Sequence, residues 1–202
     1  MNSTVDVGLI ILNQNQGLLL ERCIRSALAQ TFPGRFHEVV VADAGSTDFS
    51  REVIESYGSR IIPVFRNSPA TLAEAFWEGV KRASGRYIVC LRAQDFISDY
   101  MILFQAIWLF QNPQMPGVMA DTCLVEPGSD SKVRRVSPTE FPCFYGILWR
   151  KEVLVQEGLY EPGSRPATLE ALAETLSKKS QVGYIPIPFY RYQMDTKEAL
   201  KS

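Results

Sequence analysis

The chain has 202 residues, of which 46% are hydrophobic, so it can bury a substantial core as one domain spanning residues 1–202. Its 21 basic and 22 acidic residues give a net charge of −1, which argues against a nucleic-acid partner or an acidic membrane surface. A single histidine and four cysteines without a C-x-x-C pair argue against a zinc site. Because there is no signal peptide and no apolar run of about 20 residues, we expect a cytoplasmic protein without a membrane span.

The first half of the sequence alternates apolar strands with amphipathic helices. The patterns predict strands at residues 7–12, 39–41, 61–65 and 87–91, and helices at residues 18–29, 51–57 and 71–83. Strands that alternate with helices of this length predict β-α-β units around a largely parallel sheet. The expected fold class is therefore α/β.

The second half of the sequence has a less regular pattern. Residues 101–110 are apolar nearly all round, which predicts a buried helix. Further elements are expected at residues 118–121 (strand), 149–156 (short helix), 168–179 (amphipathic helix) and 185–192 (extended). With loops between them, this half is expected to be irregular, and nothing marks a domain boundary.

The most informative stretch is residues 38–48, which read E-V-V-V-A-D-A-G-S-T-D. Three consecutive valines predict a strand that is buried on both faces, and Asp43 stands where that strand ends. Ligands of open α/β sheets bind outside the carboxyl ends of the strands, so Asp43, Gly45 and Ser46 are candidate ligand-binding residues. The alternative is that Asp43 only caps a turn. Both interpretations remain open on this stretch alone.

Several segments together resemble the family 2 glycosyltransferases, whose catalytic domain has the GT-A fold. The segments that carry the resemblance are V-G-L-I-I-L-N-Q-N, L-E-R-C-I-R-S-A-L-A-Q-T-F, V-A-D-A-G-S-T-D, A-E-A-F-W-E-G-V-K-R-A-S-G-R-Y-I, G-V-M-A-D, W-R-K-E-V-L-V-Q-E-G-L-Y-E and Y-I-P-I-P-F-Y-R-Y. They keep the family's order and spacing from about residue 7 to residue 192. The resemblance implies a single GT-A (Rossmann-like) domain with a mostly parallel central sheet flanked by helices.

The family transfers a sugar from a nucleotide sugar, usually a UDP-sugar, to a hydroxyl of a glycan or lipid-linked acceptor. The resemblance implies that Asp43 hydrogen-bonds the base, since a carboxylate accepts the ring N–H of uracil. The other positions that it assigns to the nucleotide pocket are Leu12, Asn13, Asn15, Gly45, Ser46 and Gln94.

The chain departs from the family where a divalent metal is normally held. The family's fourth strand ends in L-D-A-D-D, but residues 91–95 read L-R-A-Q-D, a degenerate D-x-D motif. Asp95 is the one remaining candidate ligand for manganese or magnesium, and the cation at Arg92 would oppose such an ion. In an active enzyme Arg92 would instead neutralise the leaving diphosphate.

A second departure concerns the catalytic base. The family's acidic pair falls on Thr168 and Leu169, which leaves Glu170 two positions away and Asp121 as the best remaining acid. A third departure is the bulky pair Phe76 and Trp77, which would narrow the sugar pocket.

Two functions therefore remain open. One is an active glycosyltransferase of glycan or polysaccharide synthesis with an altered site. The other is a catalytically inactive domain that keeps the fold for binding or assembly, as a partner in a glycan-assembly system. A Rossmann dehydrogenase is disfavoured, because no G-x-G-x-x-G follows the first strand.

Overall fold

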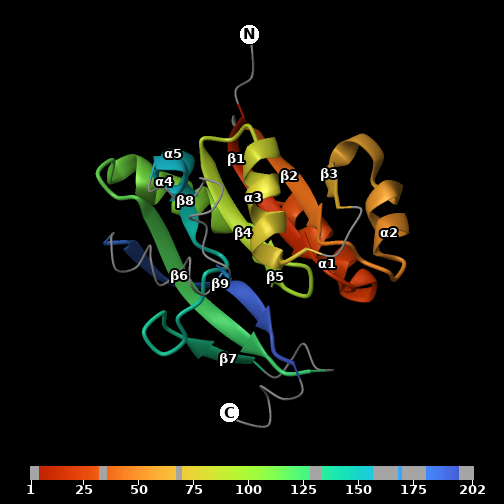
Figure 1. Ribbon diagram of the computed structural model, residues 1–202. Coiled ribbons are helices and arrows are strands. Elements are labelled where there is room, and N and C mark those ends of the chain that lie inside the picture. Colours follow the sequence, from red (N-terminus) through yellow and green to blue (C-terminus); the bar gives the residue numbers. More distant parts are fainter. Residues whose placement is uncertain are drawn as a thin grey trace.

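The structure is a computed structural model that describes residues 5–31, 36–66, 70–127, 133–156, 168–169 and 181–195. Figure 1 shows the arrangement of its elements. The strands are β1 (Val5–Asn13), β2 (Phe36–Asp43), β3 (Ile62–Phe65), β4 (Tyr87–Arg92), β5 (Phe96–Ile97), β6 (Gly117–Val125), β7 (Val133–Val136), β8 (Leu148–Arg150) and β9 (Gly183–Gln193). The helices are α1 (Gly17–Leu28), α2 (Ser50–Ser56), α3 (Leu72–Arg82), α4 (Met101–Gln111) and α5 (Lys151–Gln156), with a 3-10 turn, η1, at Gly58–Arg60.

All of these strands join one sheet, in the order β3-β2-β1-β4-β8-β6-β9-β5, with β7 added beside β6. The four strands β3, β2, β1 and β4 pair in parallel, as expected from the alternating pattern. The short strand β8 then pairs antiparallel to both β4 and β6. The last long strand, β9, runs parallel to β6.

Helices cover both faces of the parallel part of the sheet, with α3 in front of it in Figure 1. Successive side chains of a strand point to opposite faces, so β1 sends Leu9 and Ile11 into the core beneath α1 and α4. Its alternate residues Ile10 and Leu12 enter the core beneath α3. Burial on both sides explains why β1 and β2 read as continuous apolar runs.

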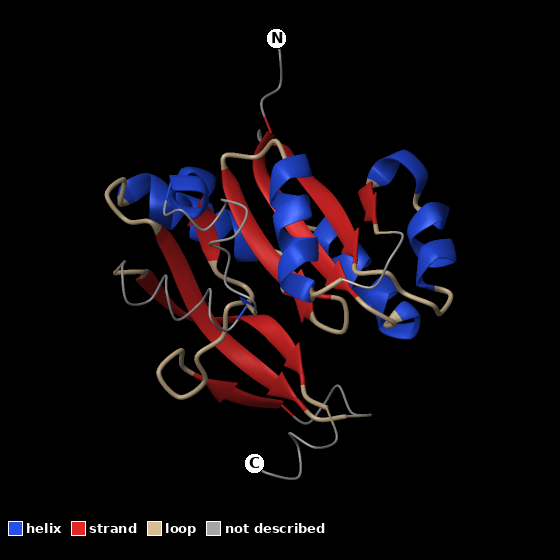
Figure 2. Cartoon of the chain, viewed as in Figure 1, coloured by secondary structure: helices blue, strands red, loops and turns tan. Residues whose placement is uncertain are grey.

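The second half of the chain is more regular than the sequence pattern indicated. Figure 2 shows a ribbon of strands, β6, β7 and β9, that extends beyond the helix-covered part of the sheet. The strand expected at residues 118–121 extends over nine residues, and the extended tail is an eleven-residue strand. The helix expected at residues 149–156 begins only at Lys151, because the residues before it form β8.

The prediction that residues 101–110 form a buried helix is wrong in one respect. The helix exists as α4, and Met101, Ile102 and Leu109 are buried in the core. Phe104 and Phe110, however, expose 46% and 75% of their surface. The reason is that only one side of α4 packs on the sheet. Along the described parts of the chain, no helix has the length and apolarity needed to cross a bilayer.

Candidate functional site

The carboxyl ends of three adjacent parallel strands bring the predicted site residues to one edge of the sheet. β2 ends at Asp43 and β4 ends at Arg92, on either side of β1. Asn13, the last residue of β1, is in register with Asp43, and Leu12 is in register with Arg92. This edge, defined by Asn13, Asp43 and Arg92, is called the carboxyl edge below.

Asp43 is 2% exposed and accepts four hydrogen bonds. Its Oδ1 accepts from Asn13 Nδ2 at 2.7 Å and from Ser46 Oγ at 2.5 Å. Its Oδ2 accepts from the backbone N–H groups of Gly45 at 3.2 Å and Ser46 at 2.9 Å. The carboxylate therefore orders the loop that follows β2, so the turn-forming role left open by the sequence is present.

The loops after β1 and β2 are tied to each other through Ser46 and Asn15. Ser46 Oγ accepts from Asn13 Nδ2 at 3.0 Å and from the Asn15 backbone N–H at 2.9 Å. Asn15 Oδ1 in turn accepts from the Thr47 N–H at 2.8 Å. Two residues adopt positive φ here, Asn15 at 53° and Gly45 at 86°, a conformation that asparagine and glycine tolerate better than other residues.

The end of β1 carries a buried acceptor that lacks a donor. The backbone carbonyls of Leu12 and Asn13 accept from the N–H groups of Ala93 and Ala44 at 3.0 and 2.9 Å. Asn13 Oδ1 is buried and has no hydrogen-bond partner in the structure. A buried polar atom without a partner is uncommon in folded proteins.

Asp48 fixes the start of α2 and connects it to α1. Its Oδ1 accepts from the Ser50 N–H and its Oδ2 from the Gly17 N–H, both at 3.0 Å. Burial raises the pKa of Asp48, but the hydrogen bonds from Ser50 and Gly17 outweigh burial and leave this pKa below its ordinary value. A carboxylate of this kind stabilises the fold above its unfolded-state pKa, and the contribution disappears as pH falls through the folded-state pKa.

We therefore expect Asp48→Asn to lower the free energy of unfolding more at about pH 7 than at about pH 3, because the stabilisation by the carboxylate decreases once the pH falls below its unfolded-state pKa. Urea denaturation at the two pH values measures this difference. An equal loss of unfolding free energy at both pH values would mean that the charge of Asp48 contributes nothing to stability.

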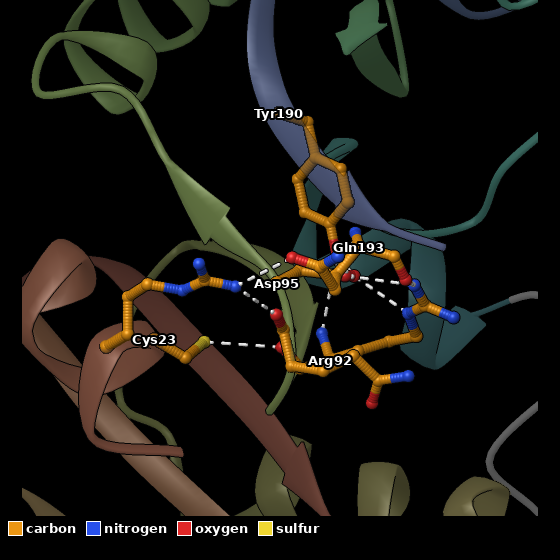
Figure 3. A network of polar contacts seen from close by, with 7 residues as sticks. Cys23, Arg92, Asp95, Tyr190 and Gln193 are labelled. Carbon is orange, nitrogen blue, oxygen red and sulfur yellow. Dashed lines mark hydrogen bonds and ion pairs between the residues drawn. The ribbon is translucent and has the colours of Figure 1, made fainter. Parts of the chain in front are cut away.

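The second cluster of predicted residues centres on an ion pair between Arg92 and Asp95. Arg92 Nε donates to Asp95 Oδ2 at 2.8 Å and Nη2 donates to Oδ1 at 2.9 Å. β9 supplies the remaining partners, because the Tyr190 hydroxyl donates to Oδ2 and the Gln193 N–H donates to Oδ1 at 2.8 Å. Figure 3 shows the Tyr190 ring pointing toward Asp95, with Gln193 beside it.

The guanidinium of Arg92 is held on several sides. Nη2 also donates to the Gln193 carbonyl at 3.0 Å, and the Tyr192 ring lies 3.5 Å from the central carbon. Burial lowers the pKa of Arg92, but the hydrogen bonds and charge of Asp95 outweigh burial and raise this pKa above its ordinary value. Arg92 is therefore charged at all working pH values, and its side chain keeps 13% exposure.

Gln94 lies in the turn between Arg92 and Asp95. Its carbonyl accepts from Arg22 Nη2 at 3.0 Å, and the same nitrogen donates to Gln193 Oε1 at 3.1 Å. Cys23 Sγ donates to the Arg92 carbonyl at 3.3 Å, and burial raises the pKa of this thiol well above its usual value. Helix α1 and strand β9 thus clamp the turn between them.

The residues at this turn do not fit a divalent ion. Both carboxylate oxygens of Asp95 accept from a guanidinium and from a β9 donor, and Asp95 is fully buried. Magnesium and manganese need carboxylate oxygens that are free to coordinate. Within the described ranges, no group of three or more His, Cys, Asp or Glu side chains is suited to a metal ion.

Asp121 is held in a similar way on β6. Its Oδ2 accepts from Arg135 Nε at 2.6 Å, and its Oδ1 accepts from the Tyr184 hydroxyl at 2.5 Å. Asp121 and Asp95 are held by different residues of β9, Tyr184 and Tyr190, and β9 has register shifts against β6 between these two. Both oxygens of Asp121 are engaged.

Two other predicted features lie elsewhere. Glu170, the alternative base, lies outside the described residues, as do residues 170–179 of the helix expected there. Phe76 and Trp77 do not narrow an open pocket. They are 0% and 1% exposed and fill the core beneath α3, with their rings edge to face at 5.1 Å.

Sequence reasoning missed the residues that hold Asp95, Asp121 and the turn from Arg92 to Asp95. They are Arg22, Arg135, Tyr184, Tyr190, Tyr192 and Gln193. The R-x-x-D spacing of Arg92 and Asp95 was a usable signal, because residues three apart across a turn can form an ion pair. The β9 partners give no such local signal.

Comparisons with known proteins agree with this architecture. The sequence profile described as "Glycosyl transferase family 2" matches residues 8–150. An uncharacterized glycosyltransferase of Nostoc sp. is 30% identical over 171 residues, which are 73% of this chain and 52% of that protein. A dolichyl N-acetyl-alpha-D-glucosaminyl phosphate 3-beta-D-2,3-diacetamido-2,3-dideoxy-beta-D-glucuronosyltransferase of Methanococcus voltae is 26% identical over 121 residues, 55% of this chain and 37% of that protein.

Solved structures of S. aureus TarS 1-349 share the fold. The complex with UDP has a TM-score of 0.77 at 14% identity and covers 98% of this chain and 63% of that chain. The complex with UDP-GlcNAc has a TM-score of 0.74 at 18% identity, with 98% and 61% covered. These likenesses establish the GT-A fold expected from the sequence.

The chain spans about half the length, or less, of the curated relatives that it matches. With the profile matching most of its residues, the chain belongs to glycosyl transferase family 2.

Proposed function

We propose that this chain binds a nucleotide sugar at the carboxyl edge and serves in a glycosyltransferase that transfers the sugar from a UDP-sugar to a hydroxyl of a glycan or lipid-linked acceptor. The observation that carries the proposal is the placement of Asn13, Asp43 and Arg92 on three adjacent strand ends. Ligands of open α/β sheets bind at such an edge. The UDP and UDP-GlcNAc complexes of TarS, which has the same fold, support this class of ligand.

In this proposal the base lies against Asn13 and Asp43. Asp43 acts mainly by holding the loop of Gly45 and Ser46 in place, because its own oxygens already accept four hydrogen bonds.

Arg92 meets the diphosphate in place of a metal ion. Its Nε and Nη2 are engaged by Asp95 and Gln193, whereas no hydrogen bond is recorded for Nη1 within the described part of the chain. Since Asp95 balances the charge of Arg92, the guanidinium contributes an oriented N–H donor more than net charge. Of the two acids proposed as base, Glu170 retains that role, because both oxygens of Asp121 are engaged.

Calorimetric titration of UDP with and without manganese tests this proposal. We expect UDP to bind with an affinity that changes by less than about twofold on adding manganese or a chelator, because Asp95 has no free oxygen for the ion. A large gain in affinity with manganese would contradict the proposed role of Arg92.

A second candidate is a non-catalytic domain that keeps the fold for binding or for assembly with a protein partner in glycan synthesis. The observation that favours it is that Asp95 and Asp121 are each held by an arginine and a tyrosine. Hydrolysis of UDP-sugars by the purified chain discriminates the two. Measurable turnover excludes the second candidate, and binding of UDP without turnover of any UDP-sugar favours it.

A further inference from the structure

A recess lies at the opposite end of β4 from Arg92. It has a volume of about 530 Å³ and is lined by Arg86, Tyr87, Arg150, Lys151, Glu152 and Val155. This volume is within the usual range for small-molecule sites. Tyr87 and Arg92 are the first and last residues of β4, about 17 Å apart along an extended strand. The recess, called the basic cleft below, is therefore separate from the carboxyl edge.

Among the described residues that line the basic cleft, three are cations and one, Glu152, carries a carboxylate. The chain brings the cations together through the backbone, because the Lys151 N–H donates to the Arg86 carbonyl at 2.9 Å. Among the residues that the structure describes, no carboxylate forms an ion pair with Arg86, Arg150 or Lys151. The described part of the lining carries an excess of two positive charges.

Two of these cations, Arg150 and Lys151, donate hydrogen bonds to carbonyl groups at helix ends. Arg150 Nη2 donates to the Leu109 carbonyl at the end of α4 at 2.9 Å. Lys151 Nζ donates to the Ala83 carbonyl at the end of α3 at 2.6 Å. Cations suit these positions, because unpaired carbonyls give a helix C-terminus a partial negative charge. The same contacts hold Arg150 and Lys151 rigidly at the wall of the cleft.

Arg86 has no comparable structural role. Its one recorded side-chain hydrogen bond is from Nη2 to the Tyr87 hydroxyl, at 3.5 Å. Arg150 Nη1 donates to the same hydroxyl at 3.3 Å. Two guanidinium groups thus converge on one neutral oxygen, and like charges repel at such separations. An anion bound between them would remove this repulsion.

We propose that the basic cleft binds a small ligand that carries a dianionic phosphate group. A phosphate group suits the positive charge of the described lining residues, and the planar fork of a guanidinium pairs well with phosphate oxygens. Arg86 is the main ligand residue, and Lys151 is a further cation of the lining. The site is independent of the nucleotide sugar and is additional to the function proposed above.

Titration of the full chain with inorganic phosphate at constant ionic strength tests the proposal, with backbone amide NMR shifts as the readout. We expect saturable shifts at the amides of Arg86, Tyr87 and Lys151, with an affinity that is independent of any shifts at Gly45, Ser46 and Arg92 of the carboxyl edge. Citrate under the same conditions tests for a carboxylate ligand. We expect citrate to bind more weakly than phosphate, because its carboxylate groups fit the forked N–H donors of the guanidinium less well.

Two substitutions at the cleft sharpen the test. Arg86→Gln should weaken phosphate binding by about tenfold, the loss expected for one charge-assisted contact. Val155→Glu should weaken it similarly, because it places a carboxylate at an exposed position on the wall. Arg60→Gln is the matched control, since Arg60 lies over the Tyr57 ring at 5.5 Å, as Arg86 does over Tyr87, but does not line the cleft.

Three outcomes would overturn the proposal. The first is the absence of saturable shifts at the cleft amides up to about 50 mM phosphate. A dissociation constant above that concentration would be too weak for a specific phosphate site. The second is an equal loss of binding in Arg60→Gln. The third is phosphate shifts confined to the amides of Gly45, Ser46 and Arg92, which would place the anion at the carboxyl edge.

Discussion

Asp95→Asn should lower the free energy of unfolding by about 3–5 kcal/mol, the usual cost of removing one partner from a buried ion pair. The substitution leaves Arg92, whose side chain is 13% exposed, without its counter-charge. An asparagine oxygen still accepts from Tyr190 or Gln193, but its NH₂ group cannot accept from the guanidinium. Guanidinium chloride denaturation followed by tryptophan fluorescence measures the loss.

The matched control for Asp95→Asn is Glu21→Gln, which breaks an exposed ion pair with Arg25. At a distance of 3.5 Å and with side chains more than half exposed, this pair should contribute less than about 0.5 kcal/mol. The double variant Arg92→Met/Asp95→Asn should recover more than half of the loss, because it removes the unpaired charge as well. A loss below about 1 kcal/mol in the single variant would show that the pair is well solvated.

Asp43→Asn should cost about 2–4 kcal/mol of stability and weaken UDP binding more than tenfold, because it leaves donors of the carboxyl edge without an acceptor. Whichever way the new amide is turned, its NH₂ group faces either Asn13 Nδ2 and Ser46 Oγ or the backbone N–H groups of Gly45 and Ser46. The loop that presents the base site should then lose its fixed geometry.

Denaturation and UDP calorimetry on the same preparation measure the two effects of Asp43→Asn. Asp99→Asn is the control, since it removes the same charge at an exposed position. It should leave stability within about 0.5 kcal/mol and binding unchanged. Full UDP affinity in Asp43→Asn would remove Asp43 and its loop from the proposed nucleotide site.

The sequence was sufficient to predict the parallel half of the sheet for a physical reason. β1, β2 and β4 are buried on both faces, so their apolar runs are continuous and end at polar residues that mark the carboxyl edge. Asp43, Gly45 and Ser46 followed from the same pattern. The strands β5 and β8, with two and three residues, are too short to show any periodicity.

Whether the carboxylates of Asp95 and Asp121 are free or engaged could not be predicted from the local sequence pattern. Whether Asp95 is free depends on Tyr190, which lies 95 residues further along the chain, and Asp121 depends on Tyr184, 63 residues away. Such pairings are determined by the register of β9 against its neighbours. The exposed side of α4 was missed for a related reason, because composition does not reveal on how many sides a helix is covered.

The bonds from β9 to Asp95 also constrain the order in which the chain can fold. The parallel unit from β1 to β4 is complete when residue 92 has been synthesised, yet Asp95 gains its bond from Gln193 across a separation of 98 residues. Closing so long a loop is slow, and contacts of this kind form late. During synthesis the turn after β4 therefore stays hydrated until β9 is made. Docking of β9 is then the step that excludes water from this turn.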